Sequence, residues 1–277
     1  MKAYAGTNYS TLVVNRSGGV GKTLLTQALR ALMTPPAGGN LRTFSIDTFE
    51  DGQQSKLSRV MSYCVDIPIA PKLSTTKSTA IAWRRLWDKV FLNIAEGNAL
   101  IDFGANVIPL FAQWLELQNG DDYGVVCAPV LLVVPITNSA QALSDGRATI
   151  EGFWKTRKVL PVGLTVVWLN EVFGPIGNIG KSSSPDYDWL ISQAREGRLT
   201  ILRMPKWEGD FAQALDARNM GLMTAYNMSD AKLYSNFGFR DQRLLLMAKV
   251  RMRDWLIAIG YELRKAGIVV DEENESA

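Results

Sequence analysis

The segment from Thr11 to Thr26 constrains this chain more than any other part of the sequence. It is an apolar, β-prone run followed by a glycine-rich loop, Arg-Ser-Gly-Gly-Val-Gly-Lys-Thr, which opens an apolar-periodic helix. Glycines allow consecutive backbone N–H groups to converge on phosphate oxygens, and the helix start adds its positive dipole end. A plain glycine-rich turn between a strand and a helix is the alternative. The complete strand–loop–helix context favours a phosphate-binding loop.

The loop assigns specific roles to individual residues. Lys22 is expected to reach the β- and γ-phosphates of a nucleotide, and the Thr23 hydroxyl is expected to hold Mg²⁺. The other nucleotide-binding candidates in the loop and the first helical turn are Gly18, Gly19, Val20, Gly21 and Leu24. The sequence therefore predicts a nucleotide-binding protein.

Composition bounds the class of protein. The chain has 277 residues, which suffices for one large α/β domain, and a net charge of +3, which is too small to indicate nucleic-acid binding by itself. The absence of histidine excludes histidine-based catalysis. The first apolar run leads directly into the loop, so no signal peptide is predicted. The longest apolar stretch, at 130–136, is too short to span a bilayer, and a cytoplasmic protein is expected.

Strand-like and helix-like segments alternate along the chain. We expect strands at 41–46, 99–103, 129–135, 163–169 and 199–204, and helices at 74–96, at 107–117, from about 208, and at 236–266. This alternation predicts an α/β fold, with a doubly wound, mostly parallel sheet and helices on both faces. No repeat or linker divides the chain, so we expect a single domain over residues 1–270. An acidic, disordered tail is expected at 271–277.

Two aspartates follow predicted strands, at the edge where open α/β sheets gather their ligands. Asp47 ends the run Phe-Ser-Ile-Asp, and Asp102 lies in Leu-Ile-Asp-Phe-Gly. Carboxylates at this edge are needed for phosphoryl transfer, because a metal ion and an in-line water must both be held. An aspartate at a strand end is also a common helix cap. Together with the loop, the pair favours the functional interpretation.

Three segments resemble a known family. The Gly-Gly-Val-Gly-Lys-Thr core at 18–23 resembles the deviant P-loop of the ParA/MinD ATPases, which belong to the SIMIBI-type class of P-loop NTPases. The segments at 99–110 and 167–176, with Gly180-Lys181 following, resemble the StbB/TraL plasmid-stability and conjugal-transfer proteins. The resemblance runs from about Thr11 to Pro205.

This resemblance implies an ATPase that uses ATP and Mg²⁺ in plasmid stability, segregation, positioning or conjugative transfer. It implies that Asp47 contributes to the metal site and positions the attacking water, and that Asp102 supports Mg²⁺. It also implies that Asn170 hydrogen-bonds adenine, although a turn residue is the alternative there. Pro205, after the last predicted strand, is a further nucleotide-binding candidate. A nucleotide-dependent homodimer and a small plasmid-encoded DNA-binding partner are the expected partners.

The loop departs from the family pattern at two positions. Arg16 stands where the P-loop consensus has glycine, and Ser17 stands where the family has its signature lysine. Arg16 either supplies the missing catalytic charge or is a solvated surface residue. Loss of the lysine implies slow hydrolysis and leaves a nucleotide-binding adaptor or scaffold as the alternative. A P-loop kinase is a further alternative, but the sequence shows neither an arginine-rich lid nor a phosphate-acceptor motif.

The predicted C-terminal helix is amphipathic. An apolar arc includes Leu245, Met252 and Ile259, whereas the other side carries arginines and lysines diluted by Asp254 and Glu262. In ParA proteins, basic C-terminal surfaces bind DNA without sequence preference, which makes this helix a candidate DNA contact. The alternative is a solvated face above a packed stripe. Because the chain ends in acidic residues, a C-terminal membrane anchor is not expected.

Overall fold

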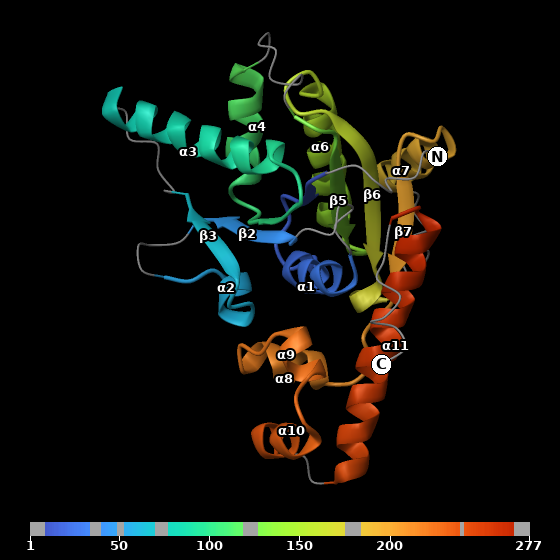
Figure 1. Ribbon diagram of the computed structural model, residues 1–277. Helices are drawn as coiled ribbons and strands as arrows, with labels where there is room; N and C mark the ends of the chain where they lie inside the picture. Colours follow the sequence, from blue (N-terminus) through green and yellow to red (C-terminus); the bar gives the residue numbers. More distant parts are fainter. Residues whose placement is uncertain are drawn as a thin grey trace.

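The computed structural model describes residues 9–33, 40–48, 53–69, 77–118, 127–174, 184–238 and 241–268. These residues form seven strands that alternate with helices along the chain (Figure 1). The strands are β1 (Thr11–Val13), β2 (Arg42–Asp47), β3 (Cys64–Pro68), β4 (Ala99–Phe103), β5 (Val130–Ile136), β6 (Val162–Asn170) and β7 (Thr200–Met204).

All seven strands belong to one parallel sheet with the order β3-β2-β4-β1-β5-β6-β7. β1 lies at the centre, with β5, β6 and β7 following outward in chain order on one side. On the other side β4 lies between β1 and the earlier strands β2 and β3. The expected α/β class and doubly wound sheet are confirmed, and every pairing is parallel. In such a sheet all carboxyl ends lie at one edge, so the loop after β1 and the ends of β2 and β4 meet there.

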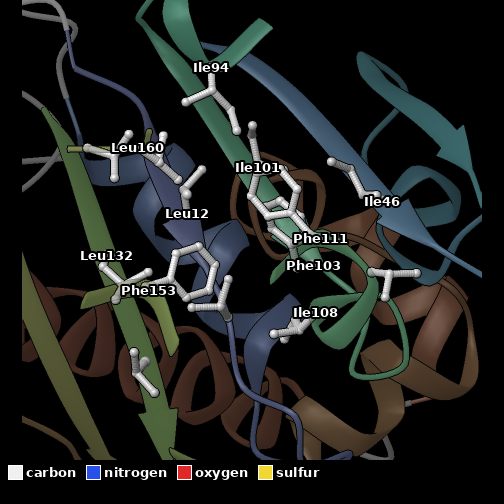
Figure 2. Close-up of a cluster of buried hydrophobic side chains, with 14 of the residues drawn as sticks. Leu12, Ile46, Ile94, Ile101, Phe103, Ile108, Phe111, Leu132, Phe153 and Leu160 are labelled. Carbon is white, nitrogen blue, oxygen red and sulfur yellow. The ribbon is translucent and has the colours of Figure 1, made fainter. Parts of the chain in front are cut away.

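Apolar side chains alternate between the two faces of the central strands, which explains why helices cover both faces. Leu12, Ile101 and Leu132 belong to one buried cluster, whereas Val13 and Leu131 belong to the other. Figure 2 shows the first cluster, in which Phe111 and Phe153 meet side chains of β1, β4 and β5. The helices on this face are α3 (Lys77–Ala95), α4 (Ile108–Leu117), α6 (Ala140–Lys155) and α7 (Pro185–Arg195).

The second face is covered by α1 and by the C-terminal helices. The helices of this layer are α1 (Lys22–Leu32), α8 (Phe211–Ala217), α9 (Leu222–Tyr226), α10 (Asp230–Phe237) and α11 (Gln242–Lys265). Trp207 stacks on Trp255 of α11, with ring centroids 5.3 Å apart, and also contacts Phe211. These aromatic contacts hold α8 against α11, beside the start of α1.

The C-terminal helix differs from its prediction. One helix was expected over 236–266, but the structure has two, and residues 236 and 237 belong to α10. Gly238 adopts the left-handed conformation, with φ of 61°, and ends α10 as glycine commonly does. The helix expected from about 208 begins at Phe211, because Gly209 has a positive φ of 84°.

Two elements near the site were not expected. They are α2 (Lys56–Val60) and the edge strand β3, in which Val65 is exposed. A mostly exposed edge strand lacks the apolar alternation that would reveal it. The expected acidic tail at 271–277, the first residues of the helix expected from 74, and most of the loop at 171–184 lie outside the described residues. Within the described part of the chain, no helix is both long and apolar enough to cross a membrane.

Candidate nucleotide-binding site

The phosphate-binding loop (P-loop, residues 15–23) connects β1 to α1 at the centre of the carboxyl edge of the sheet. Gly19 and Gly21 have φ values of 69° and 91°, a conformation that side-chain-bearing residues rarely adopt. A Cβ atom at Gly21 would lie 2.6 Å from Nδ2 of Asn170. The turn therefore requires glycine at both positions, and at Gly21 the close approach of β6 requires it as well.

Lys22 lies inside the P-loop. Its ammonium group donates hydrogen bonds to the carbonyl oxygens of Asn15, at 2.9 Å, and Ser17, at 2.7 Å. Burial lowers the pKa of Lys22, while the nearby carboxylates of Asp102 and Asp47 act in the opposite direction. The lysine is thus held at the loop, within the field of both predicted carboxylates.

Thr23 and Asp102 are in direct contact. The Thr23 hydroxyl donates a 2.9 Å hydrogen bond to Oδ2 of Asp102, while Oδ1 is buried and has no hydrogen-bond partner among the described residues. Burial raises the pKa of Asp102 to about 6, against the opposing effects of the Thr23 hydrogen bond and the Lys22 charge. A buried carboxylate oxygen without a partner, beside a hydroxyl, is an oxygen donor set that suits a hard cation such as Mg²⁺.

Asp47 ends β2 and lies against Gly104. Its Oδ1 accepts a 2.7 Å hydrogen bond from the Thr48 N–H, and a Cβ atom at Gly104 would lie 2.0 Å from the same oxygen. The Gly104 N–H in turn bonds the Ile46 carbonyl oxygen at 2.8 Å. The absence of a side chain at position 104 therefore makes room for the Asp47 carboxylate beside the end of β4.

Arg16 and Ser17, the two departures from the family pattern, are both directed to α6. Ser17 Oγ donates a 2.6 Å hydrogen bond to Oδ2 of Asp145. Arg16 is half-buried, and its Nη2 would lie 3.8 Å from a Cβ atom at Gly152 of α6. Neither residue lines the cavities beside the P-loop that are described below.

Asn170 and Pro205 make structural contacts of their own. The Asn170 amide donates to the Val20 carbonyl oxygen at 3.0 Å and accepts from the Val172 N–H at 3.1 Å, so it ties the P-loop to the end of β6. The Pro205 carbonyl oxygen accepts a 2.9 Å hydrogen bond from the indole of Trp255. A role of either residue toward adenine stays a prediction.

Two cavities flank Lys22 and Thr23. The first, of about 240 Å³, contains Asp47, Asp102 and Gly104 in its lining. The second, of about 370 Å³, lies between the P-loop, α2 and the α8 region, and Leu24 lines it. Among the described residues, Lys22, Thr23 and Lys56 line both cavities. Their positions suit a phosphate chain that passes from one cavity to the other.

The site thus has two sides. The sheet side comprises the P-loop together with Asp47 and Asp102. The helix side comprises Lys56, Trp207 and Asp216, which the sequence analysis did not identify. Their segments are polar or irregular and match no motif, so only the folded chain reveals that they meet the P-loop.

Comparison with known proteins gives distant structural likenesses only. No protein-family model matches the sequence, and no curated protein matches it. One similar structure is a variant of McdA from Cyanothece in complex with ATP, with 17% identity, a TM-score of 0.41, and coverage of 92% of this chain and 98% of that chain. At this identity and TM-score the likeness assigns neither a family nor a function to this chain.

Two further structures are similar at the same level. Apo McdA from Cyanothece shares 16% identity with a TM-score of 0.41, over 86% of this chain and 99% of that chain. A structure described as a partition protein shares 13% identity with a TM-score of 0.38, over 79% of this chain and 72% of that chain.

Proposed function

We propose that this chain binds ATP with Mg²⁺ and hydrolyses it, as a ParA/MinD-like ATPase that serves plasmid segregation, positioning or conjugative transfer. One observation carries the proposal: Lys22, Thr23 and Asp102 converge at the carboxyl edge of the sheet, around a glycine-rich loop at a helix N-terminus. This is the set of groups that phosphoryl transfer requires. The resemblance of the P-loop to that of the ParA/MinD ATPases supports the choice of family.

The donor set fits Mg²⁺. Thr23 supplies a hydroxyl, and Asp102 supplies a buried carboxylate oxygen without a partner among the described residues. When bound, the metal would stabilise negative charge on the phosphates. The residues themselves would hold it, Thr23 at the start of α1 and Asp102 from β4.

The other groups of the sheet side would bind the phosphate chain and orient the attacking water. The Lys22 ammonium would exchange its two loop carbonyls for phosphate oxygens, and the N–H groups around Gly19 and Gly21 would hold the phosphate chain. Asp47, in the 240 Å³ cavity, would orient the attacking water. These roles together describe a site able to cleave the terminal phosphate.

Slow hydrolysis follows from the residues at positions 16 and 17. Ser17 is bonded to Asp145 and Arg16 lies against α6, so neither places a cation toward the cavities. This observation favours a second candidate function, a nucleotide-binding adaptor with little turnover. In either form we propose a nucleotide-dependent homodimer in the cytoplasm that works with a small DNA-binding partner.

Direct DNA contact through α11 is part of the proposal, but the outer face of this helix is not purely basic. Arg243, Arg251 and Arg253 are exposed there, and so are Leu246 and Val250. Phosphate neutralisation would use the arginines, whereas the apolar residues suit contact with protein.

The proposal is tested by nucleotide titration of the wild-type chain and of Lys22→Ala. The wild type is expected to bind ATP–Mg²⁺, and the variant is expected to lose that binding. Unchanged ATP affinity in the variant would contradict the site assignment. Phosphate release, measured with and without plasmid-length DNA, separates the ATPase from the adaptor, because the adaptor would show no stimulated turnover.

A further inference from the structure

Lys56 is a cation at the site that no sequence motif identifies. It is the first residue of α2 and lines both cavities beside the P-loop, a position it shares with Lys22 and Thr23. Lys22 and Lys56 are the two cations that line either cavity within the described part of the chain. The positive charge of Lys56 also acts on Asp102, whose pKa it lowers in part.

The backbone of Lys56 is fixed on the sheet. Ser55 caps α2, since its hydroxyl oxygen accepts a 3.0 Å hydrogen bond from the Ser58 N–H. The Ser55 N–H and the Ser58 hydroxyl both donate to Oδ2 of Asp66 on β3. Because these hydrogen bonds hold the first turn of α2 on β3, a change of partner at Lys56 would involve its side chain and not its backbone.

That side chain is paired with α8. The Lys56 Nζ lies 2.8 Å from Oδ1 of Asp216, and the two side chains are 56% and 59% exposed. The pair links α2 to α8, and residues of both helices line the 370 Å³ cavity together with the P-loop. An exposed ion pair contributes little to stability, so a ligand with more negative charge competes for the lysine easily.

We propose that Lys56 exchanges its ion pair with Asp216 for the terminal phosphate of a bound nucleoside triphosphate. Lys56 then supplies the cation that Arg16 and Ser17 do not supply, and it distinguishes a triphosphate from a diphosphate. The exchange releases Asp216, so it also uncouples α2 from α8 when the triphosphate is bound. This inference rests on the proposed function.

The test is a comparison of ATP–Mg²⁺ and ADP–Mg²⁺ dissociation constants by calorimetry. Lys56→Ala is expected to weaken ATP binding about tenfold or more, because it removes a hydrogen bond between charged groups, and to leave ADP binding within about twofold. Lys56→Arg is expected to retain most of the preference for ATP. Asp216→Asn is expected to bind ATP at least as tightly as the wild type.

The controls separate this inference from the proposed function. Lys158→Ala removes an exposed lysine in the turn that follows α6 and is expected to change neither constant. If the wild type binds both nucleotides and Lys56→Ala keeps the ATP-to-ADP ratio, only this inference is overturned. An equal loss of affinity for ATP and ADP in Lys56→Ala also overturns this inference. If the wild type binds neither nucleotide, the proposed function fails and this inference fails with it.

Discussion

The sheet side and the helix side of the site are built differently. On the sheet side, Thr23 and Asp102 meet through a hydrogen bond that is part-buried, and Lys22 is held by loop carbonyls. On the helix side, an exposed ion pair between Lys56 and Asp216 spans two helices. The difference indicates that the P-loop backbone and the position of Asp102 are set before a ligand arrives, with Lys22 already held at the loop, whereas the helix side separates its ion pair at little cost.

The largest expected effect comes from Trp207, which holds the helix side in place. Trp207 is 7% exposed and stacks on Trp255. We expect Trp207→Ala to lower the free energy of unfolding by about 3–5 kcal/mol, because it leaves a cavity among aromatic rings. Urea unfolding measures the loss, and hydrogen exchange locates it. The comparison predicts that α8 and α11 lose protection before β1 and β4.

Trp207→Phe is the matched control, since it keeps an aromatic ring and is expected to lose less. If Trp207→Ala lost hydrogen-exchange protection uniformly across the sheet, the sheet side and the helix side would unfold as one cooperative unit. The proposed difference between them would then be wrong.

The next effect is electrostatic and lies on the sheet side. Burial raises the pKa of Asp102 from 3.8 to about 6. The folded protein then binds this proton more tightly than the unfolded chain, so the contribution of Asp102 to the free energy of unfolding falls as pH rises from about 4 to about 6 and is level above. A pKa difference of about two corresponds to about 3 kcal/mol.

Asp102→Asn removes the cost of burying an ionised carboxylate and keeps a hydrogen-bond acceptor for Thr23. Without nucleotide or Mg²⁺, we expect the variant to be more stable than the wild type at pH 7 and similar to it near pH 4. Urea unfolding across this range is the measurement. An identical pH dependence in both proteins would show that Asp102 is not the group responsible.

The sequence predicted the sheet side because its signals are local. The glycines of the P-loop and the apolar runs of β4 and β5 each identify their own structure, and the strand ends then bring Asp47 and Asp102 to one edge. The roles of Asp47 and Asp102 are hypotheses from the sequence. The structure adds the hydrogen bond between Thr23 and Asp102.

The helix side was not predictable in this way. Lys56 and Asp216 meet only in the folded chain, and neither lies in a motif. The expectation of one C-terminal helix was wrong because the apolar period continues past Gly238, whose left-handed backbone ends α10. For Arg16 the sequence left two interpretations, and its position is set by contact of the P-loop with α6, a helix more than 100 residues later in the sequence.

A third prediction tests how closely the sheet side is packed. Gly104→Ala would place a Cβ atom 2.0 Å from Oδ1 of Asp47, so the carboxylate must move. If the chain hydrolyses ATP as proposed, we expect turnover to fall between about 10-fold and 100-fold, because a displacement of about 1 Å misplaces the attacking water. ATP affinity is expected to change much less, since the P-loop is not altered.

Phosphate release and nucleotide titration measure the two effects in Gly104→Ala. Gly152→Ala is the control, because Gly152 lies on α6 and its added Cβ atom would meet only Nη2 of Arg16, at an ordinary contact distance of 3.8 Å. Equal turnover in Gly104→Ala and the wild type would show that Asp47 does not position the water.

The smallest expected effect distinguishes the two sides most directly. In a double-mutant cycle of Lys56→Ala and Asp216→Ala, we expect a coupling of about 0.2–1 kcal/mol in the ligand-free protein, because both side chains are exposed. The matched cycle of Ser17→Ala and Asp145→Ala removes a 2.6 Å hydrogen bond to a carboxylate, and Ser17 is only 9% exposed. There we expect about 1.5–3 kcal/mol.

Measuring both couplings at two ionic strengths makes this last test more specific. Raising the ionic strength should reduce the Lys56–Asp216 coupling further and leave the Ser17–Asp145 coupling almost unchanged, since an exposed pair is screened and a part-buried hydrogen bond is screened less. If both cycles gave the same coupling and the same salt dependence, the contrast between a fixed sheet side and an exchangeable helix side would not hold. The ion pair would then resist a competing phosphate, and α2 would stay coupled to α8 whichever nucleotide is bound.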